Sequence, residues 1–287
     1  MNVDAAPQNA ARALLAFWRA AGVDMDGAEA VYAAAAPVKA LSVPGSAAKE
    51  PIARPDLAGA DLGRRAPTAP RLRPGPSSPI DNARALAAAA HSVADLRKAV
   101  EGFEGCALKT TARNTVFSDG LDDAPVLVIG EAPGKDEDEQ GKPFVGRSGQ
   151  LLDRMLALIG LSRQQNVLIS NTIYWRPPGN RDPTQGEIVA CLPFVERLIE
   201  LKQPKLLILT GKAAAHTVLK REDGVMKLRG RRLGYTREGL ASPINAMVML
   251  HPAYLLRQPQ QKRVAWADLL LAETWLEELG VQRASHP

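Results

Sequence analysis

Short apolar runs alternate with stretches of helical periodicity over the last two thirds of the chain. The apolar runs each lead into a polar or glycine-rich loop, and they cover residues 125–130, 166–173, 205–210 and 246–250. Apolar side chains recur at helical spacing in residues 80–101, 149–159, 187–201, 212–220 and 262–279. Because a strand that is apolar at every position is buried on both faces, the pattern predicts an α/β fold, a three-layer αβα sandwich with a central four-stranded parallel sheet.

The residues before this region follow a different pattern. Residues 9–35 are rich in alanine and carry an apolar stripe, which is typical of a short helix or helical hairpin. Residues 37–79 contain nine prolines and no periodicity, so they bury too little apolar surface to offset the entropy of ordering. We therefore expect a helical segment at 1–36, a disordered linker at 37–79 and a folded domain at 80–287.

Composition and charge exclude some classes of protein. The chain has 287 residues, of which 46% are hydrophobic, and no run approaches the roughly 20 apolar residues of a membrane helix. It begins without a basic leader and holds two cysteines, Cys106 and Cys191, so we expect a reduced cytoplasmic protein. The net charge is +5, but seven basic and three acidic residues lie in 37–79. Charge is therefore weak evidence for a nucleic-acid partner, although a linker that tethers the chain to DNA is one alternative.

Each predicted strand ends in a distinctive loop, at the edge of the sheet where ligands bind in folds of this kind. The loops contain no dinucleotide fingerprint, phosphate loop or nucleophile elbow, and the cysteines have no zinc-site spacing. The loop sequences are GEAPG at 130–134, PFVG at 143–146, RPPGNR at 176–181 after Asn171, TGKA at 210–213 and HPAYLL at 251–256.

These motifs, in this order, resemble those of the uracil-DNA glycosylase superfamily and most closely those of its family 4. The resemblance covers residues 106–279. It implies a monomeric enzyme that flips uracil out of single- or double-stranded DNA and hydrolyses the deoxyuridine N-glycosidic bond, leaving an abasic site. The expected partners are uracil-containing DNA and the abasic product, which would associate this cytoplasmic protein with the nucleoid.

The resemblance also assigns roles within the base pocket. Hydrolysis builds positive charge on the sugar and negative charge on uracil O2, so His251 would donate a hydrogen bond to O2 and Glu131 would position water. The Asn171 amide offers a donor and an acceptor for the uracil edge, Phe144 offers a flat face for stacking, and Glu137 would exclude the thymine methyl group. Two loop residues complete the expected pocket, Gly130 and Ala132.

Each of these residues also has a plain structural interpretation. Phe144 is then an apolar loop anchor, Asn171 a turn residue and His251 a packed histidine. The acidic run at 136–139 is then a solvated surface.

A second group of residues is expected to bind DNA. Arg147 and Ser148 open a helix, and helix N-termini bind phosphate well. Basic side chains in 227–232 and in the last loop would neutralise phosphates, and an apolar side chain would fill the gap left by the flipped base. The expected residues of these two loops are Arg229, Arg231, Leu255, Leu256 and Arg257.

The chain departs from the family 4 pattern at the iron–sulfur cluster, which family 4 usually binds through four cysteines. The corresponding positions here are Phe103, Cys106, Trp175 and Cys191. Two thiolates do not hold such a cluster, so we expect no cofactor and no metal, with the aromatic rings filling its volume. A related branch captures DNA covalently through a histidine, but residues 175–185 contain none, so covalent capture is not expected.

Two other functions remain open at this point. The same fold would suit a glycosylase for another deaminated base, such as hypoxanthine, and a panel of lesion oligonucleotides separates the two. A non-catalytic protein that binds uracil or abasic DNA would retain the DNA without making it sensitive to alkali.

Overall fold

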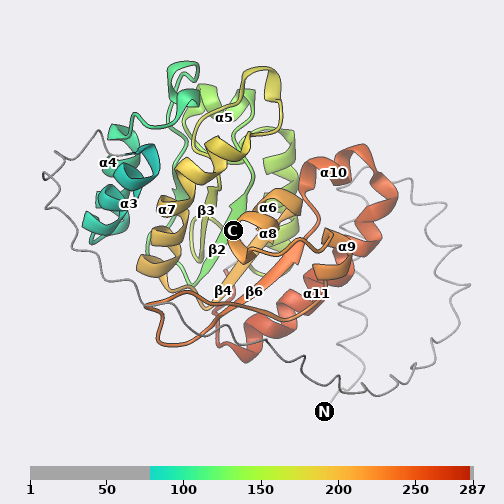
Figure 1. The fold of residues 1–287 in the computed structure, drawn as a ribbon. Helices are drawn as coiled ribbons and strands as arrows, with labels where there is room; N and C mark the ends of the chain where they lie inside the picture. Colours follow the sequence, from blue (N-terminus) through green and yellow to red (C-terminus); the bar gives the residue numbers. More distant parts are fainter. Residues whose placement is uncertain (1–77, 285–287) are drawn as a thin grey trace, which may run out of the picture.

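The computed structural model describes residues 78–284 (Figure 1). The expected helical segment at 1–36 lies outside the described residues, as does the linker up to residue 77. No helix within 78–284 is long and apolar enough to span a membrane.

A six-stranded sheet in the order β1-β3-β2-β4-β6-β5 forms the centre of the domain. The four inner strands are parallel, and they are β2 (Val126–Gly130), β3 (Val167–Asn171), β4 (Leu206–Thr210) and β6 (Ile244–Met249). These are the four predicted strands. Two three-residue strands, β1 (Ser118–Gly120) and β5 (Leu233–Tyr235), extend the sheet antiparallel at its edges, so the predicted total of four is too low by two.

Alternate residues of the inner strands feed two apolar cores, one on each face of the sheet. Leu127 and Ile129 pack on one face against a first layer of four helices, whereas Val126 and Val128 pack on the other face against a second layer of three. The three-layer α/β prediction is thereby confirmed. The helices of the first layer are α3 (Pro79–Ala89), α4 (Val93–Gly102), α7 (Gln185–Lys202) and α8 (Gly211–Leu219), and those of the second are α6 (Arg147–Leu158), α10 (Pro252–Arg257) and α11 (Lys262–Glu278).

The helix predicted for 80–101 is in fact two helices, α3 and α4, which lie beside α7 in Figure 1. Ala90 is extended, and the Ser92 hydroxyl caps α4 by accepting a hydrogen bond from the Asp95 N–H at 3.1 Å. The periodicity continues across the break, which is why the sequence predicted one helix. The remaining helical turns are η1 (Ala107–Thr110), α5 (Lys135–Gln140), η2 (Pro178–Asn180), α9 (Val225–Leu228) and η3 (Pro259–Gln261).

Candidate active site

A cavity of about 720 Å³ lies where the loops after the four parallel strands meet. Glu131 follows β2, Asn171 ends β3, Lys212 follows β4 and His251 follows β6, and all four line this cavity. Parallel strands bring their carboxyl ends to one edge of the sheet, so residues far apart in the sequence converge there. The expected pocket residues Gly130 and Ala132 belong to the same place, because Gly130 ends β2 and Ala132 lines the cavity.

His251 is held as a neutral hydrogen-bond donor. It precedes α10, and its Nδ1 accepts a hydrogen bond from the Ala253 N–H at 3.1 Å. The proton of the neutral ring is therefore on Nε2. Burial, followed by the positive charge of Arg257, lowers the pKa of His251 to about 4. At neutral pH the ring is uncharged and its Nε2–H is available to a ligand.

Phe144 has an unusual backbone that places its ring beside His251. Its φ is +54°, a left-handed conformation that costs a residue other than glycine about 1–3 kcal/mol. The two rings are stacked with centroids 5.6 Å apart and an interplanar angle of 30°. Gly130 makes room for this arrangement, because a Cβ at that position would lie 2.5 Å from the Phe144 ring and from Asn171 Oδ1.

Asn171 is buried at the end of β3, opposite Gly130 in the sheet register. Within residues 78–284 no hydrogen bond is formed by the side-chain amide of Asn171, and the residue lines the cavity. A buried amide normally has its donor and acceptor satisfied. Asn171 thus presents one acceptor and two donor hydrogens to whatever occupies the cavity.

Glu131 lies beside these groups in a partly buried position. Its backbone oxygen accepts hydrogen bonds from the Ile173 N–H at 3.0 Å and the Thr172 hydroxyl at 2.7 Å, so the loop is anchored through its main chain. Burial, and then the negative charge of Asp182, raises the pKa of the Glu131 carboxyl. A carboxylate with a raised pKa is a better proton acceptor than an exposed one.

The carboxylate of Glu137 is occupied by the loop itself. It accepts hydrogen bonds from the N–H groups of Gly134 at 3.0 Å and of Val145 and Gly146 at 2.9 Å each. Glu137 therefore braces the two halves of the loop that carries Phe144, a role that its place in an acidic run did not indicate. Its residue lines the cavity, and the exclusion of the thymine methyl group stays a prediction.

Comparison with known proteins identifies the family of this fold and cavity. A sequence profile of the Uracil DNA glycosylase superfamily matches residues 117–271, which is more than half of the chain. This chain belongs to the uracil-DNA glycosylase superfamily.

Its relatives include enzymes named type-4 uracil-DNA glycosylase. The one from Archaeoglobus fulgidus is 35% identical over 181 residues, which are 62% of this chain and 89% of the relative. The one from Saccharolobus solfataricus is 38% identical over 57% of this chain and 76% of the relative, and the one from Sulfurisphaera tokodaii is 32% identical over 62% and 81%. The family 4 resemblance of the sequence is thereby confirmed.

Of the residues expected to bind DNA, some lie at the cavity or on the surface, whereas Arg229 is paired within the fold. Ser148 and Arg257 line the cavity, and Arg147 and Arg231 are exposed. Arg229 instead makes an ion pair with Asp268 at 2.6 and 2.9 Å and donates to the Val264 carbonyl, which joins the segment after α9 to α11. The structure thus corrects the expectation for Arg229, because its guanidinium is already occupied within the fold.

The expected apolar wedge also needs a correction. Leu255 is 0% exposed and packs in the core beneath α10, so the prediction that it contacts DNA is wrong. Leu256 is partly exposed on the same helix. Sequence reasoning missed Met226, which lies at the rim of the cavity and is 59% exposed, because no motif includes it. It also gave no role to Lys212, which lines the cavity and stands in a loop that was singled out.

The residues at the family 4 cluster positions do not fit an iron–sulfur cluster. Phe103 and Trp175 are buried with ring centroids 6.4 Å apart, and the Phe194 ring lies 5.1 Å from Phe103. Cys106 and Cys191 are free and buried, and the hydrogen bond with Cys106, together with burial, raises the pKa of the Cys191 thiol. Within residues 78–284 no group of three or more His, Cys, Asp or Glu side chains is placed to hold a metal ion.

Proposed function

We propose that this chain hydrolyses the N-glycosidic bond of deoxyuridine in single- and double-stranded DNA, releasing uracil and leaving an abasic site. Membership of the superfamily and the names of its relatives support the activity. The observation that carries the proposal is the grouping in one cavity of a neutral His251, the stacked Phe144 ring and the unpartnered amide of Asn171.

These three side chains match the chemistry of a flipped uracil. The base would lie against the Phe144 face, with its O4 and N3–H paired to the Asn171 amide. His251 Nε2–H would donate to O2, where negative charge grows as the bond to the sugar breaks. Because the pKa of His251 is about 4, the ring is neutral at pH 7 and stabilises that oxygen through a hydrogen bond from its remaining N–H.

Glu131 would serve the sugar side of the reaction. The C1′–N1 bond breaks with its electron pair leaving on uracil, and the oxygen of a water molecule then bonds to C1′. Glu131 would hold this water, accept its proton and stabilise the positive sugar. The raised pKa of its carboxyl suits it to accept a proton.

We propose that DNA is bound by the exposed groups around the cavity. The N-terminus of α6 with Arg147 and Ser148, together with Arg231 and Arg257, would contact phosphates. Leu256, which is partly exposed on α10, would fill the gap left by the flipped base.

The same proposal includes no iron–sulfur cluster. It is supported by the residues at the four cluster positions, because two of them, Phe103 and Trp175, are buried aromatic side chains that cannot bind iron. Iron analysis and the visible absorption spectrum of freshly purified protein test this. Iron in a ratio of several atoms per chain, with a broad visible band, would contradict it.

The activity is tested with an end-labelled oligonucleotide that contains one uracil, in EDTA, followed by alkali. We expect cleavage at the uracil, with His251→Ala lowering kcat by about 10²–10³-fold, and no cleavage of the matched thymine oligonucleotide. Hypoxanthine cleaved in preference to uracil would indicate a different base. Retention of the uracil oligonucleotide on a native gel without cleavage would indicate a binding protein.

A further inference from the structure

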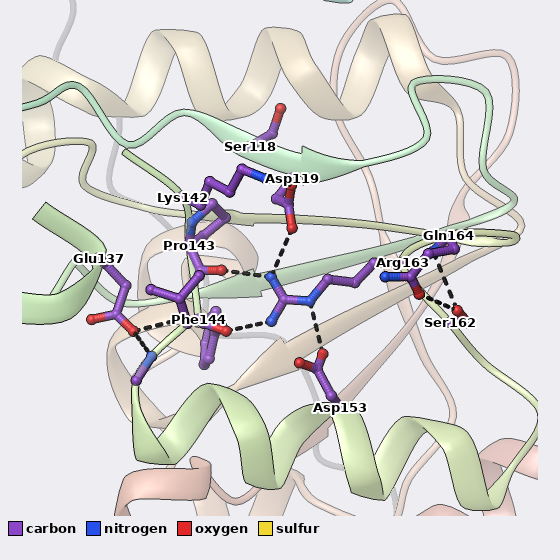
Figure 2. A network of polar contacts seen from close by, with 12 residues as sticks. Ser118, Asp119, Glu137, Lys142, Pro143, Phe144, Asp153, Ser162, Arg163 and Gln164 are labelled. Carbon is purple, nitrogen blue, oxygen red and sulfur yellow. Dashed lines mark hydrogen bonds and ion pairs between the residues drawn. The ribbon is translucent and has the colours of Figure 1, made fainter. Parts of the chain in front are cut away.

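Four successive residues, Pro143 to Gly146, are held by two charged side chains of opposite sign (Figure 2). Arg163 donates from Nη1 to the Pro143 carbonyl at 2.6 Å and from Nη2 to the Phe144 carbonyl at 2.5 Å. Glu137 accepts from the N–H groups of the next two residues. Side chains on both sides therefore fix the peptide groups around Phe144.

Arg163 is itself held firmly in place. It lies between α6 and β3, its side chain is 8% exposed, and it pairs with Asp153 at 2.7 Å and Asp119 at 3.1 Å. Asp153 is on α6 and Asp119 is on the edge strand β1, so the guanidinium joins these two elements to the Phe144 loop. Its two carboxylate partners balance its charge, which makes a contact with DNA phosphate an unsuitable role for it.

The backbone of Phe144 has little freedom to move elsewhere. A Cβ at Gly149, in the first turn of α6, would lie 1.9 Å from the Phe144 carbonyl oxygen, so the helix packs directly against that carbonyl. The left-handed conformation of Phe144 is unfavourable by itself and persists only where its surroundings determine it. On this side of the loop, Arg163 donates hydrogen bonds to the carbonyl groups of Pro143 and Phe144.

We propose that Arg163 is a positioning residue of the base pocket, which acts on the bound base only through Phe144. This inference rests on the proposed function. The Arg163 guanidinium sets the carbonyls on either side of the Phe144 Cα, and these set where the ring stands relative to His251 and Asn171. Because a displacement of about 1 Å of a positioning group costs up to about 10²-fold in rate, small movements of this ring matter.

The test compares Arg163→Met with the wild type in kcat, in KM, in inhibition by free uracil, and in binding of a uracil-free duplex. We expect the variant to lower kcat about 10- to 100-fold and to weaken uracil inhibition about tenfold, with binding of the uracil-free duplex within about twofold. Arg197→Met is the matched control. Arg197 is a partly buried arginine that donates to the Ala90 carbonyl at 2.8 Å and pairs with Glu200, on the opposite face of the sheet from α6.

A double-mutant cycle tests whether the effect passes through the ring. In a Phe144→Ala background, we expect Arg163→Met to change uracil inhibition by less than about twofold. The same tenfold loss in both backgrounds would overturn the proposal. If Arg163→Met is unfolded at the assay temperature, Arg163→Lys keeps the charge but loses the planar fork, and wild-type kcat and uracil inhibition in that folded variant would equally overturn it.

The outcomes also separate this inference from the proposed function. A wild type that releases no uracil contradicts the function itself. A wild type that releases uracil, alongside an Arg163→Met variant with unchanged kcat and uracil inhibition, contradicts only the positioning role. A loss of kcat in Arg197→Met as large as that in Arg163→Met would show a general effect of instability and would also overturn it.

Discussion

The pKa of His251 leads to a prediction about stability as well as activity. The imidazole titrates at about 4 in the folded chain, against 6.5 for an unperturbed histidine, because it is buried and close to Arg257. The gap between these values corresponds to about 3 kcal/mol. The unfolded chain binds a proton at this site below pH 6.5, whereas the folded chain stays neutral down to about pH 4. His251 therefore contributes its full share of stability above pH 6.5 and loses it as the pH falls from 6.5 to 4.

The assay is the free energy of unfolding by urea at several pH values, for the wild type and for His251→Gln. Glutamine does not titrate, so the difference between the two proteins should change by about 3 kcal/mol between pH 7.5 and pH 4, in the direction that favours the variant at low pH. His251 is one of four histidines, so an NMR titration assigned with the same variant reads its pKa directly. A His251 resonance that titrates near 6.5, with a stability difference independent of pH, would refute the reasoning.

Three further predictions concern side chains in and around the site. Leu255→Ala should lower the free energy of unfolding by about 2–5 kcal/mol, because it removes a fully buried side chain. Leu256 is only partly buried against the same core, so Leu256→Ala should lower stability less and should reduce cleavage of duplex more than of single strands. Equal stability losses would contradict the assignment. Gly130→Ala should abolish most activity while the chain still folds, since the new Cβ would lie 2.5 Å from the pocket ring, and unchanged uracil inhibition would contradict this. Arg229→Met should cost about 3–5 kcal/mol in urea unfolding by leaving Asp268 buried and unpaired, and Asp268→Asn in the same background should restore part of that loss.

The sheet and its site edge could be read from the sequence because both depend on local pattern. A strand such as β4, which is buried at every position, is apolar at nearly every position, and its polar successor marks the edge of the sheet. The edge strands β1 and β5 could not be found this way, since three residues give no period. The break between α3 and α4 was not predicted either, because the helical spacing of apolar residues continues after Ser92.

The corrections within the site come from contacts that no local pattern encodes. Leu255 and Leu256 are chemically identical neighbours, and only the packing of α10 on the core decides which of them is buried. Arg229 belongs to a basic run that is typical of a DNA-binding surface, yet its partner Asp268 stands 39 positions later on α11. From sequence alone, a basic side chain is assigned to the surface. An ion pair with a buried acidic residue on another element makes that assignment wrong.

The residues that would touch the base can be predicted from the sequence more readily than the residues that hold them in place. Asn171 ends one buried strand and His251 follows another, so the convergence of parallel strand ends brings them together. Phe144 does not lie at the end of a strand, so the sheet alone does not bring it to the pocket. Its ring reaches the pocket only because Gly130 leaves room for it and because its backbone adopts φ of +54°. Arg163 supports that conformation by donating hydrogen bonds to acceptors 19 and 20 positions earlier in the chain. These acceptors are main-chain carbonyls, which every residue type has. A hydrogen bond to a main-chain carbonyl does not restrict the type of the residue that accepts it. The contacts that support Phe144 therefore cannot be predicted from the sequence and are found only in the folded structure.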